Sequence, residues 1–134
     1  MNRKFVVSAV TMFVLAMVIG FVVHAVMLHG EYAKLPNLMR TEADAQQHFG
    51  YLIFAHVLFA LGFTWIYLQG RSAAKHWVGQ GVRFGLAIAV LTTIPTYLIY
   101  FTVMPFPSDL VAQQIVLDSI GVVLLALVLA WMNR

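Results

Sequence analysis

Among the polar side chains that interrupt the apolar stretches of the sequence, four are the strongest candidates to support chemistry. They are His24, His56, Tyr97 and Asp118. An aspartate at the centre of a membrane helix costs about 2.5–3.5 kcal/mol on insertion scales, so we expect Asp118 to face a polar partner. Imidazole and carboxylate groups can pair with each other, relay protons or bind a metal or haem.

The composition indicates which kind of element must position these residues. The chain has 134 residues, of which 62% are hydrophobic and only 10% are charged. Soluble domains have about 45–50% apolar and about 25% charged residues. A chain of this size cannot bury so much apolar surface by itself, because too much of it lies at the boundary. The composition therefore predicts an integral membrane protein.

Two further features of the composition exclude some classes of function. The sequence contains no cysteine, which excludes disulfides, thiolate metal sites and a cysteine nucleophile. The net charge is +3, but the basic residues are scattered and form no run with interleaved aromatic residues. We therefore expect no nucleic-acid partner.

Four apolar segments are long enough to cross a bilayer as α-helices, which takes about 20 residues. They cover residues 5–28, 49–68, 78–103 and 110–132. The first is too long for the apolar region of a signal peptide, which has about 7–15 residues, so we expect a retained anchor. Short connections favour antiparallel neighbours. The sequence thus predicts an all-α, up-down-up-down four-helix bundle that forms a single transmembrane domain over residues 1–134.

The distribution of charge predicts the orientation of this bundle. Six basic residues fall on the side of the termini: Arg3, Lys4, Arg71, Lys75, Arg83 and Arg134. The other side has two basic and four acidic residues: Lys34, Arg40, Glu31, Glu42, Asp44 and Asp109. By the positive-inside rule, both termini are expected in the cytoplasm.

The longest connection, residues 29–48, lies on the outer side. Its "TEAD" stretch resembles a capping box, in which the Thr41 hydroxyl caps the amide of Asp44 and the Asp44 carboxylate reciprocates. The second helix is therefore expected to start near residue 41. In the third span, Pro95 has no amide hydrogen to donate to the Leu91 carbonyl, which predicts a kink. The hydroxyls of nearby threonines are expected to donate to the carbonyl that Pro95 leaves without a partner.

Small residues recur at helical spacing in all four spans, and such residues let membrane helices approach closely. The clearest case is Gly81-x-x-x-Gly85, a small-x-x-x-small pattern. The predicted helix-packing residues are Gly20, Ala60, Gly81, Gly85, Ala89 and Gly121.

The polar residues fall at similar depths below the outer ends of their spans. With a rise of about 1.5 Å per residue, His24 lies roughly 6 Å deep, Tyr97 roughly 9 Å, His56 roughly 10 Å and Asp118 roughly 12 Å. Gln114 shares the helix face of Asp118. We therefore expect these five residues to form a polar cluster in the outer half of the bundle. Whether Asp118 meets His24, His56 or Tyr97 stays open.

Several functions are compatible with such a cluster. Its hydrogen bonds could simply set helix register, at about 0.6 kcal/mol each. His24 and His56 could bind a metal or haem, although no cofactor is predicted, and an Asp–His pair could relay protons in a transporter. Catalysis is not expected, because no catalytic motif is present and Ser119 points about 100° away from Asp118.

The stretches "LHGEY", "FTWIYLQGR" and "GQGVRFGLAIAVLTTIPTYLIYF" together resemble a class of small bacterial four-span membrane proteins. The resemblance covers nearly the whole chain. It implies the four-span fold and a bacterial inner-membrane location. The class has no established activity, so the resemblance implies no catalytic residues.

The leading prediction is a non-catalytic accessory subunit or scaffold, associated with other membrane subunits or with itself. Two features motivate it: stripes of small residues that exceed the needs of one bundle, and the absence of a complete reaction site. The alternative is a binding or transport protein whose outward-facing His/Asp/Tyr pocket holds a metal, haem, proton or small ligand.

Overall fold

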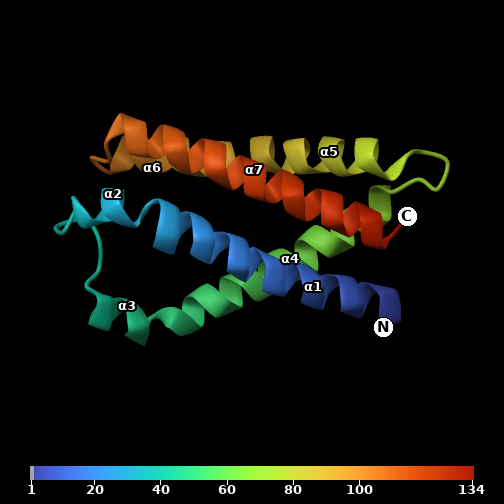
Figure 1. Ribbon diagram of the computed structural model, residues 1–134, viewed down its shortest axis with the longest axis horizontal. Coiled ribbons are helices and arrows are strands. Elements are labelled where there is room, and N and C mark those ends of the chain that lie inside the picture. Colours follow the sequence, from blue (N-terminus) through green and yellow to red (C-terminus); the bar gives the residue numbers. More distant parts are fainter. Residues whose placement is uncertain (1) are drawn as a thin grey trace.

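The structure is a computed structural model that describes residues 2–134. It is 83% helical, and no strand occurs in these residues. The elements are α1 (Arg3–Gly20), η1 (Phe21–Met27), α2 (His29–Ala33), α3 (Glu42–Gln47), α4 (Phe49–Gly70), α5 (Trp77–Ile88), η2 (Ala89–Thr93), α6 (Ile94–Val103) and α7 (Ser108–Met132). The segments η1 and η2 are π-helical and continue α1 and α5 without a break in direction (Figure 1).

Four continuous helical segments are long and apolar enough to cross a membrane: Arg3–Met27, Phe49–Gly70, Trp77–Val103 and Ser108–Met132. They agree closely with the predicted spans. Successive segments run in opposite directions, and both termini lie at the same end of the molecule (Figure 1). The prediction of an all-α protein with four long apolar helices is confirmed.

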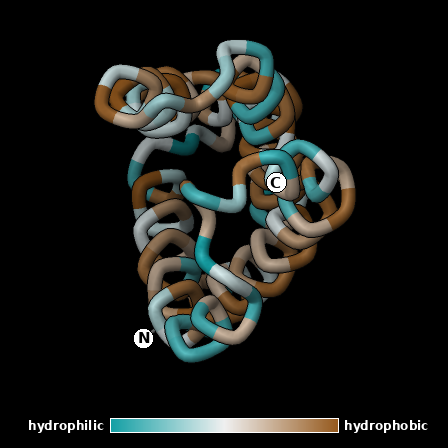
Figure 2. The backbone as a smooth tube through the Cα atoms, turned by 90° about the vertical axis from the view of Figure 1, so that its left-hand side faces the viewer, coloured by the Kyte–Doolittle hydropathy of each residue, from teal (hydrophilic) through white to brown (hydrophobic). Residues whose placement is uncertain are grey.

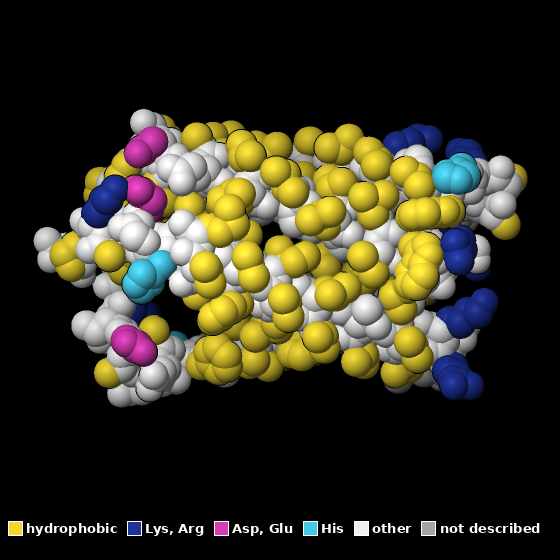
Figure 3. Space-filling model, in the orientation of Figure 1, with side chains coloured by type: hydrophobic (Ala, Val, Ile, Leu, Met, Phe, Trp, Pro, Cys, Tyr) yellow, Lys and Arg dark blue, Asp and Glu magenta, His cyan; other side chains and the backbone are white. Residues whose placement is uncertain are grey.

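Polar and charged residues concentrate at the two ends of the bundle. The helices are mainly hydrophobic along their length, and hydrophilic residues gather in the connections (Figure 2). Most Lys and Arg lie at the end that carries the termini, whereas Asp and Glu, with fewer basic side chains, lie at the opposite end (Figure 3). We call these the terminal end and the loop end. Between them many large apolar side chains are exposed, such as Leu91 at 71% and Val103 at 68%, as expected for a lipid-facing surface.

The core is formed where α1 and α7 lie against each other, with α4 packed on α1 and with α5 and α6 packed on α7. The closest approach is between α5 and α7. A Cβ atom added to Gly85 would lie 2.7 Å from the Cα of Val123, and one added to Gly81 would lie 3.1 Å from the Cα of Leu127. At Gly85 only glycine allows this distance between the two backbones, and at Gly81 a larger residue would be tightly packed.

The other small residues occupy different positions. Gly121 faces α1, since an added Cβ would lie 2.8 Å from Ile19 Cγ2. Ala60 and Ala89 are buried, at 1% and 2% exposure. Gly20 is the exception, because its added Cβ would meet only His56 Nε2, at an ordinary 3.5 Å. Gly20 therefore borders a side chain rather than a closely packed helix.

The start of the second span differs from the expected continuous helix. Thr41 does cap α3, accepting a hydrogen bond from the Asp44 amide at 3.3 Å. The Asp44 carboxylate, however, accepts from Arg40 at 2.7 Å instead of reciprocating. The helix ends at Gln47, and His48 leaves helical geometry with φ −101° and ψ 4° before α4 begins. The capped turn is thus a separate element above the span.

The irregularity that Pro95 predicts takes the form of the π-helical segment η2. The amide of Ile94 donates to the Ala89 carbonyl, five residues back, so the wide turn precedes the proline. Thr92 donates to the Ile88 carbonyl at 2.8 Å, and not to Leu91 as expected. The other π-helical segment, η1, contains no proline and was not predicted from the sequence.

Candidate functional site

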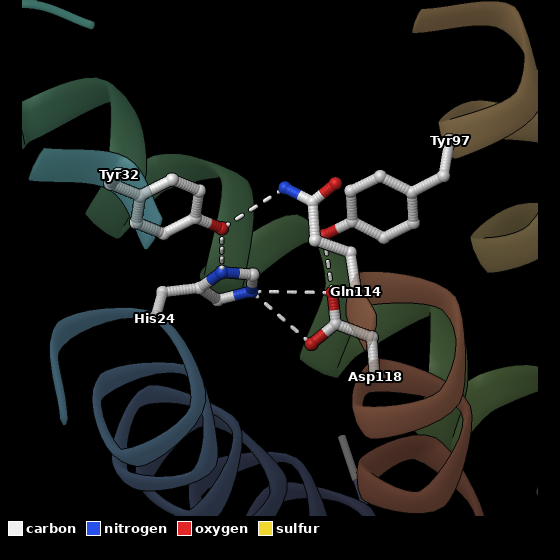
Figure 4. A network of polar contacts seen from close by, with 5 residues as sticks. All are labelled: His24, Tyr32, Tyr97, Gln114 and Asp118. Atoms are coloured by element: carbon white, nitrogen blue, oxygen red, sulfur yellow. Dashed lines mark hydrogen bonds and ion pairs between the residues drawn. The ribbon is translucent and has the colours of Figure 1, made fainter. Parts of the chain in front are cut away.

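The carboxylate of Asp118 is the centre of a hydrogen-bonded network between helices (Figure 4). His24 Nε2 lies 3.2 Å from both carboxylate oxygens, and the Tyr97 hydroxyl donates to one of them. The Asp118 side chain is 20% exposed and that of His24 is 35% exposed. The structure thus brings together three of the residues that the sequence singled out.

The network continues from His24 toward the loop end. His24 Nδ1 lies 2.6 Å from the hydroxyl of Tyr32 in α2, and the buried Gln114 amide donates to that hydroxyl at 3.0 Å. The rings of His24 and Tyr32 also stack, with centroids 6.0 Å apart. We call these five residues the polar network: His24, Tyr32, Tyr97, Gln114 and Asp118.

The hydrogen bonds of the network are compatible with one neutral tautomer of His24. Gln114 donates to the Tyr32 oxygen, so the Tyr32 hydrogen is free to be donated to His24 Nδ1. Nδ1 then acts as an acceptor, and the ring proton sits on Nε2, where it is donated to Asp118. With His24 as a neutral imidazole, both of its ring nitrogens and the hydroxyls of Tyr32 and Tyr97 are hydrogen-bonded, so the network is compatible with this tautomer. The network then holds one carboxylate and no cation.

Tyr32 is suited to its role as a donor. Burial raises the pKa of the Tyr32 phenol above its usual value, the hydrogen bond from Gln114 lowers it, and the negative charge of Asp118 raises it further. Because the net shift is upward, the phenol keeps its proton at neutral pH and remains able to donate to His24.

Local structure explains how the network is assembled. Gly121 brings α7 against Ile19 of α1, so that Asp118, about one turn away, reaches His24 across this contact. His24 lies in η1, whose wide turns hold more residues than α-helical turns and change which residues share a face. Tyr97 lies in α6 directly after η2 and Pro95. Both π-helical segments therefore adjoin the network, and such segments are frequent at functional sites.

An open groove with a volume of about 710 Å³ adjoins the network. α4 forms one wall, η2 and α6 form the other, and α1 and α7 form the floor. Most of its lining is apolar or aromatic. The polar side chains that line it are His24, His56, Thr92, Thr93, Thr96, Tyr97, Tyr100 and Asp118. No Lys or Arg lines the groove.

His56 does not belong to the polar network, which corrects the expected five-residue cluster. Its Nδ1 bonds the Leu52 carbonyl of its own helix at 2.8 Å. The expected clustering used depth alone, and depth does not determine which way a ring faces across the bundle. Nε2 of His56 faces the groove near Gly20 and has no hydrogen bond within residues 2–134.

Two other types of chemistry have little support in this arrangement. Within the described part of the chain, no three His, Cys, Asp or Glu residues are placed to hold a metal ion. His24 uses both ring nitrogens in the network, so His24 and His56 do not present two free ligands. The Ser119 oxygen is buried without a hydrogen-bond partner in residues 2–134, so no base activates it there.

Tyr32 is the network residue that the sequence analysis missed. It lies beyond the first span in a polar connection, where an exposed tyrosine is the ordinary expectation. One signal was present: Tyr32 follows His24 by eight residues, close to two helical turns. Using it would have required knowing that a separate short helix, α2, follows the first span after Leu28.

The chain was compared with known protein families, with curated proteins and with solved structures, and none of them matches it.

Proposed function

We propose that the chain is a multi-pass protein of a bacterial inner membrane, with both termini in the cytoplasm. The four apolar helices support the membrane setting. The six basic residues at the terminal end support the orientation, since basic residues are retained in the cytoplasm. In this orientation the polar network lies in the half of the bundle nearer the outer surface.

Within that membrane, we infer that the protein binds an amphiphilic molecule with a protonated amine head and an apolar tail. The observation that carries this proposal is the carboxylate of Asp118, which borders the groove and has no Lys or Arg among its partners. A carboxylate in largely apolar surroundings without a cation is unfavourable, and a bound ammonium group would neutralise it.

The atoms that face the groove support an amine rather than an acid. Asp118 offers carboxylate oxygens, and His56 Nε2 is an acceptor because Nδ1 donates to Leu52. An ammonium group has three hydrogens to donate and no lone pair, so it matches these acceptors. An anionic head would find no Lys or Arg in the lining.

The size and lining of the groove support an amphiphile rather than a bare cation. A volume of about 710 Å³ falls within the roughly 300–1,000 Å³ of small-molecule sites. Apolar residues such as Leu52, Phe59 and Leu125 extend from the polar network along the groove. They provide a surface for a hydrocarbon tail.

One of the two observations that favoured an accessory subunit, the stripes of small residues, has another explanation. The small residues that suggested contacts with other subunits are mainly used inside the chain: Gly81 and Gly85 face α7, and Gly121 faces α1. Association with other membrane subunits or with a second copy stays a prediction.

The test compares three probes with the same dodecyl tail in nanodiscs: dodecylammonium, dodecanol and dodecanoate. We expect wild type to prefer the amine over the alcohol by about tenfold or more, because hydrogen bonds to charged groups contribute about 1.5–3 kcal/mol. Asp118→Asn should abolish this preference. Asp109→Asn, an exposed acid on the same helix, should retain it.

The preference is measured as a ratio of affinities within each variant, so partial misfolding of Asp118→Asn lowers both affinities and leaves the ratio readable. Equal preference in wild type and Asp118→Asn would refute the amine proposal. Binding of none of the three probes would refute the groove as a ligand site.

A second candidate, proton-coupled transport of the same ligand, is favoured by the continuity of the network. Hydrogen bonds connect Tyr32 at the loop end through His24 and Asp118 to Tyr97 beside the groove. Such chains of ionisable groups relay protons in transporters. Amine-driven acidification or alkalinisation of proteoliposomes would distinguish transport from binding alone.

A further inference from the structure

A second pocket lies at the terminal end, between α4 and α5, and is independent of the groove. It has a volume of about 300 Å³ and carries three cationic side chains. We call it the basic pocket. It is lined by Ile66, Tyr67, Gly70, Arg71, Lys75, Gln80, Arg83 and Phe84.

No acidic side chain balances the three cations. The Asp and Glu residues of the chain are Glu31, Glu42, Asp44, Asp109 and Asp118, and none lines the basic pocket. The ion pairs found within residues 2–134 involve Lys34, Arg40 and two histidines, but neither Arg71 nor Lys75 nor Arg83. Three like charges around one pocket repel one another unless an anion occupies it.

The pocket is held in shape before any ligand arrives. Gln80 of α5 accepts from the Ser72 amide at 2.7 Å and donates to the carbonyls of Ser72 and Lys75 at 2.9 Å each. These three bonds fix the connection that carries Arg71 and Lys75. Arg71 also donates to the Asn133 carbonyl beyond α7, which restrains its side chain.

We propose that the basic pocket binds the phosphate of an anionic phospholipid. Arg and Lys side chains supply donors for phosphate oxygens, and basic pockets between helices on the cytoplasmic side are typical sites for such headgroups. The neighbouring lining is apolar, with Ile66 45% exposed and Phe84 beside it. This surface favours a phosphate that carries acyl chains over a free phosphate ion.

The position of Arg83 along α5 also favours a lipid as the ligand. It lies six residues inside α5, roughly 9 Å from the start of the helix. A headgroup held between Arg83 and Lys75 would therefore sit at the boundary between the helix and its connection. Its acyl chains would continue along the apolar surface of α4 and α5.

The test uses two matched double variants of the full chain. Lys75→Gln/Arg83→Gln removes one Lys and one Arg from the pocket. Lys4→Gln/Arg3→Gln removes the same charges from the same end but outside it. Arg71 is left intact because it binds Asn133. Native mass spectrometry in detergent counts the phosphatidylglycerol molecules bound, with phosphatidylcholine as the neutral comparison.

We expect wild type and Lys4→Gln/Arg3→Gln to retain one phosphatidylglycerol in preference to phosphatidylcholine. Lys75→Gln/Arg83→Gln should bind it about tenfold or more weakly, since each basic residue contributes to headgroup binding. Equal weakening in both double variants would overturn the proposal, because the effect would then reflect overall charge. Equal binding of both lipids by wild type would overturn it as well.

A final experiment distinguishes a phospholipid from a free phosphate ion as the ligand of the basic pocket. Inorganic phosphate at millimolar concentration is added to the lipid-bound protein. We expect it to leave the lipid in place. Complete displacement would overturn the lipid assignment and identify the pocket as a site for the free anion.

Discussion

Asp118 illustrates how an ionisable residue can be retained in an apolar helix. Inserting it costs about 2.5–3.5 kcal/mol, and a single hydrogen bond contributes about 1 kcal/mol. Two donors, His24 and Tyr97, offset part of this cost. Neither donor is a Lys or Arg, and with His24 as a neutral imidazole the negative charge is not compensated within the network. That remaining charge is what makes the residue a candidate for ligand binding.

Tyr32 is the residue on which the stability of the network depends, because it connects Gln114 to His24. We expect Tyr32→Phe to lower the free energy of unfolding by about 1–3 kcal/mol, since it leaves the buried Gln114 amide and His24 Nδ1 without a partner. Thermal unfolding in detergent would measure the change.

The matched control is Tyr51→Phe, because Tyr51 is 76% exposed and its hydroxyl makes no hydrogen bond within residues 2–134. It should leave stability nearly unchanged. Equal melting temperatures for the two variants would contradict a structural role for the Tyr32 hydroxyl.

The neutral tautomer of His24 leads to a spectroscopic prediction. In 15N spectra of histidine-labelled protein at neutral pH, the resonances lost in His24→Gln should show a protonated Nε2 and an unprotonated Nδ1. The reason is that Tyr32 donates to Nδ1. Two protonated nitrogens would show that His24 carries a positive charge, and Asp118 would then need no ammonium ligand.

At this scale the sequence indicates which residues are candidates for the site, but not which partners they meet. His24, Tyr97 and Asp118 stand out because polar groups are costly within apolar runs. Their rotation about each helix axis depends on local twist, and the π-helical turns change it. Depth alone therefore placed His56 beside Asp118, and Tyr32 was not expected in the network.

Among the elements, α5 and α7 show the clearest relation between sequence and packing. The Gly81-x-x-x-Gly85 pattern predicts a close helix contact, and the structure places both glycines against the α7 backbone. The partner helix, in contrast, could not be predicted, because small residues occur in all four spans. The wide turn η2 follows from Pro95, whereas η1 has no comparable signal.

The close contact predicts opposite effects for two glycine substitutions. Gly85→Ala should destabilise the protein by about 1–3 kcal/mol, because its Cβ would lie 2.7 Å from the Val123 backbone. Gly62→Ala, in the middle of α4, meets nothing within 4 Å and should stabilise it by about 0.5–1 kcal/mol.

Unfolding in mixed micelles would measure both variants under the same conditions. The difference in sign is the informative result, since both substitutions add one methyl group to a helical glycine. If Gly85→Ala were as stable as Gly62→Ala, the close approach of α5 to α7 would be wrong.

For the whole molecule, the two ends differ in charge and each adjoins a different candidate site. The groove with its carboxylate lies toward the loop end, and the basic pocket lies at the terminal end. This arrangement was predictable in part, because the distribution of Lys and Arg can be read from the sequence. The pockets were not predictable, since they depend on how far the helices separate.

The proposed orientation can be tested with single cysteines, because the natural chain has none. Ala43→Cys places a thiol on α3, and Ala74→Cys places one in the connection before α5; both positions are exposed. In intact spheroplasts, an impermeant maleimide should label Ala43→Cys, whereas Ala74→Cys should react only after lysis. The reverse pattern would invert the proposed topology.

The position of the groove has a consequence for how a ligand would arrive. Its two walls, α4 and α6, pack on different helices, so its opening lies along the side of the bundle. In the proposed setting, a ligand would enter by lateral diffusion within the lipid phase instead of crossing a water-filled vestibule. Occupancy would then follow the mole fraction of the ligand in the bilayer, and partitioning into lipid would concentrate even a scarce molecule at the site.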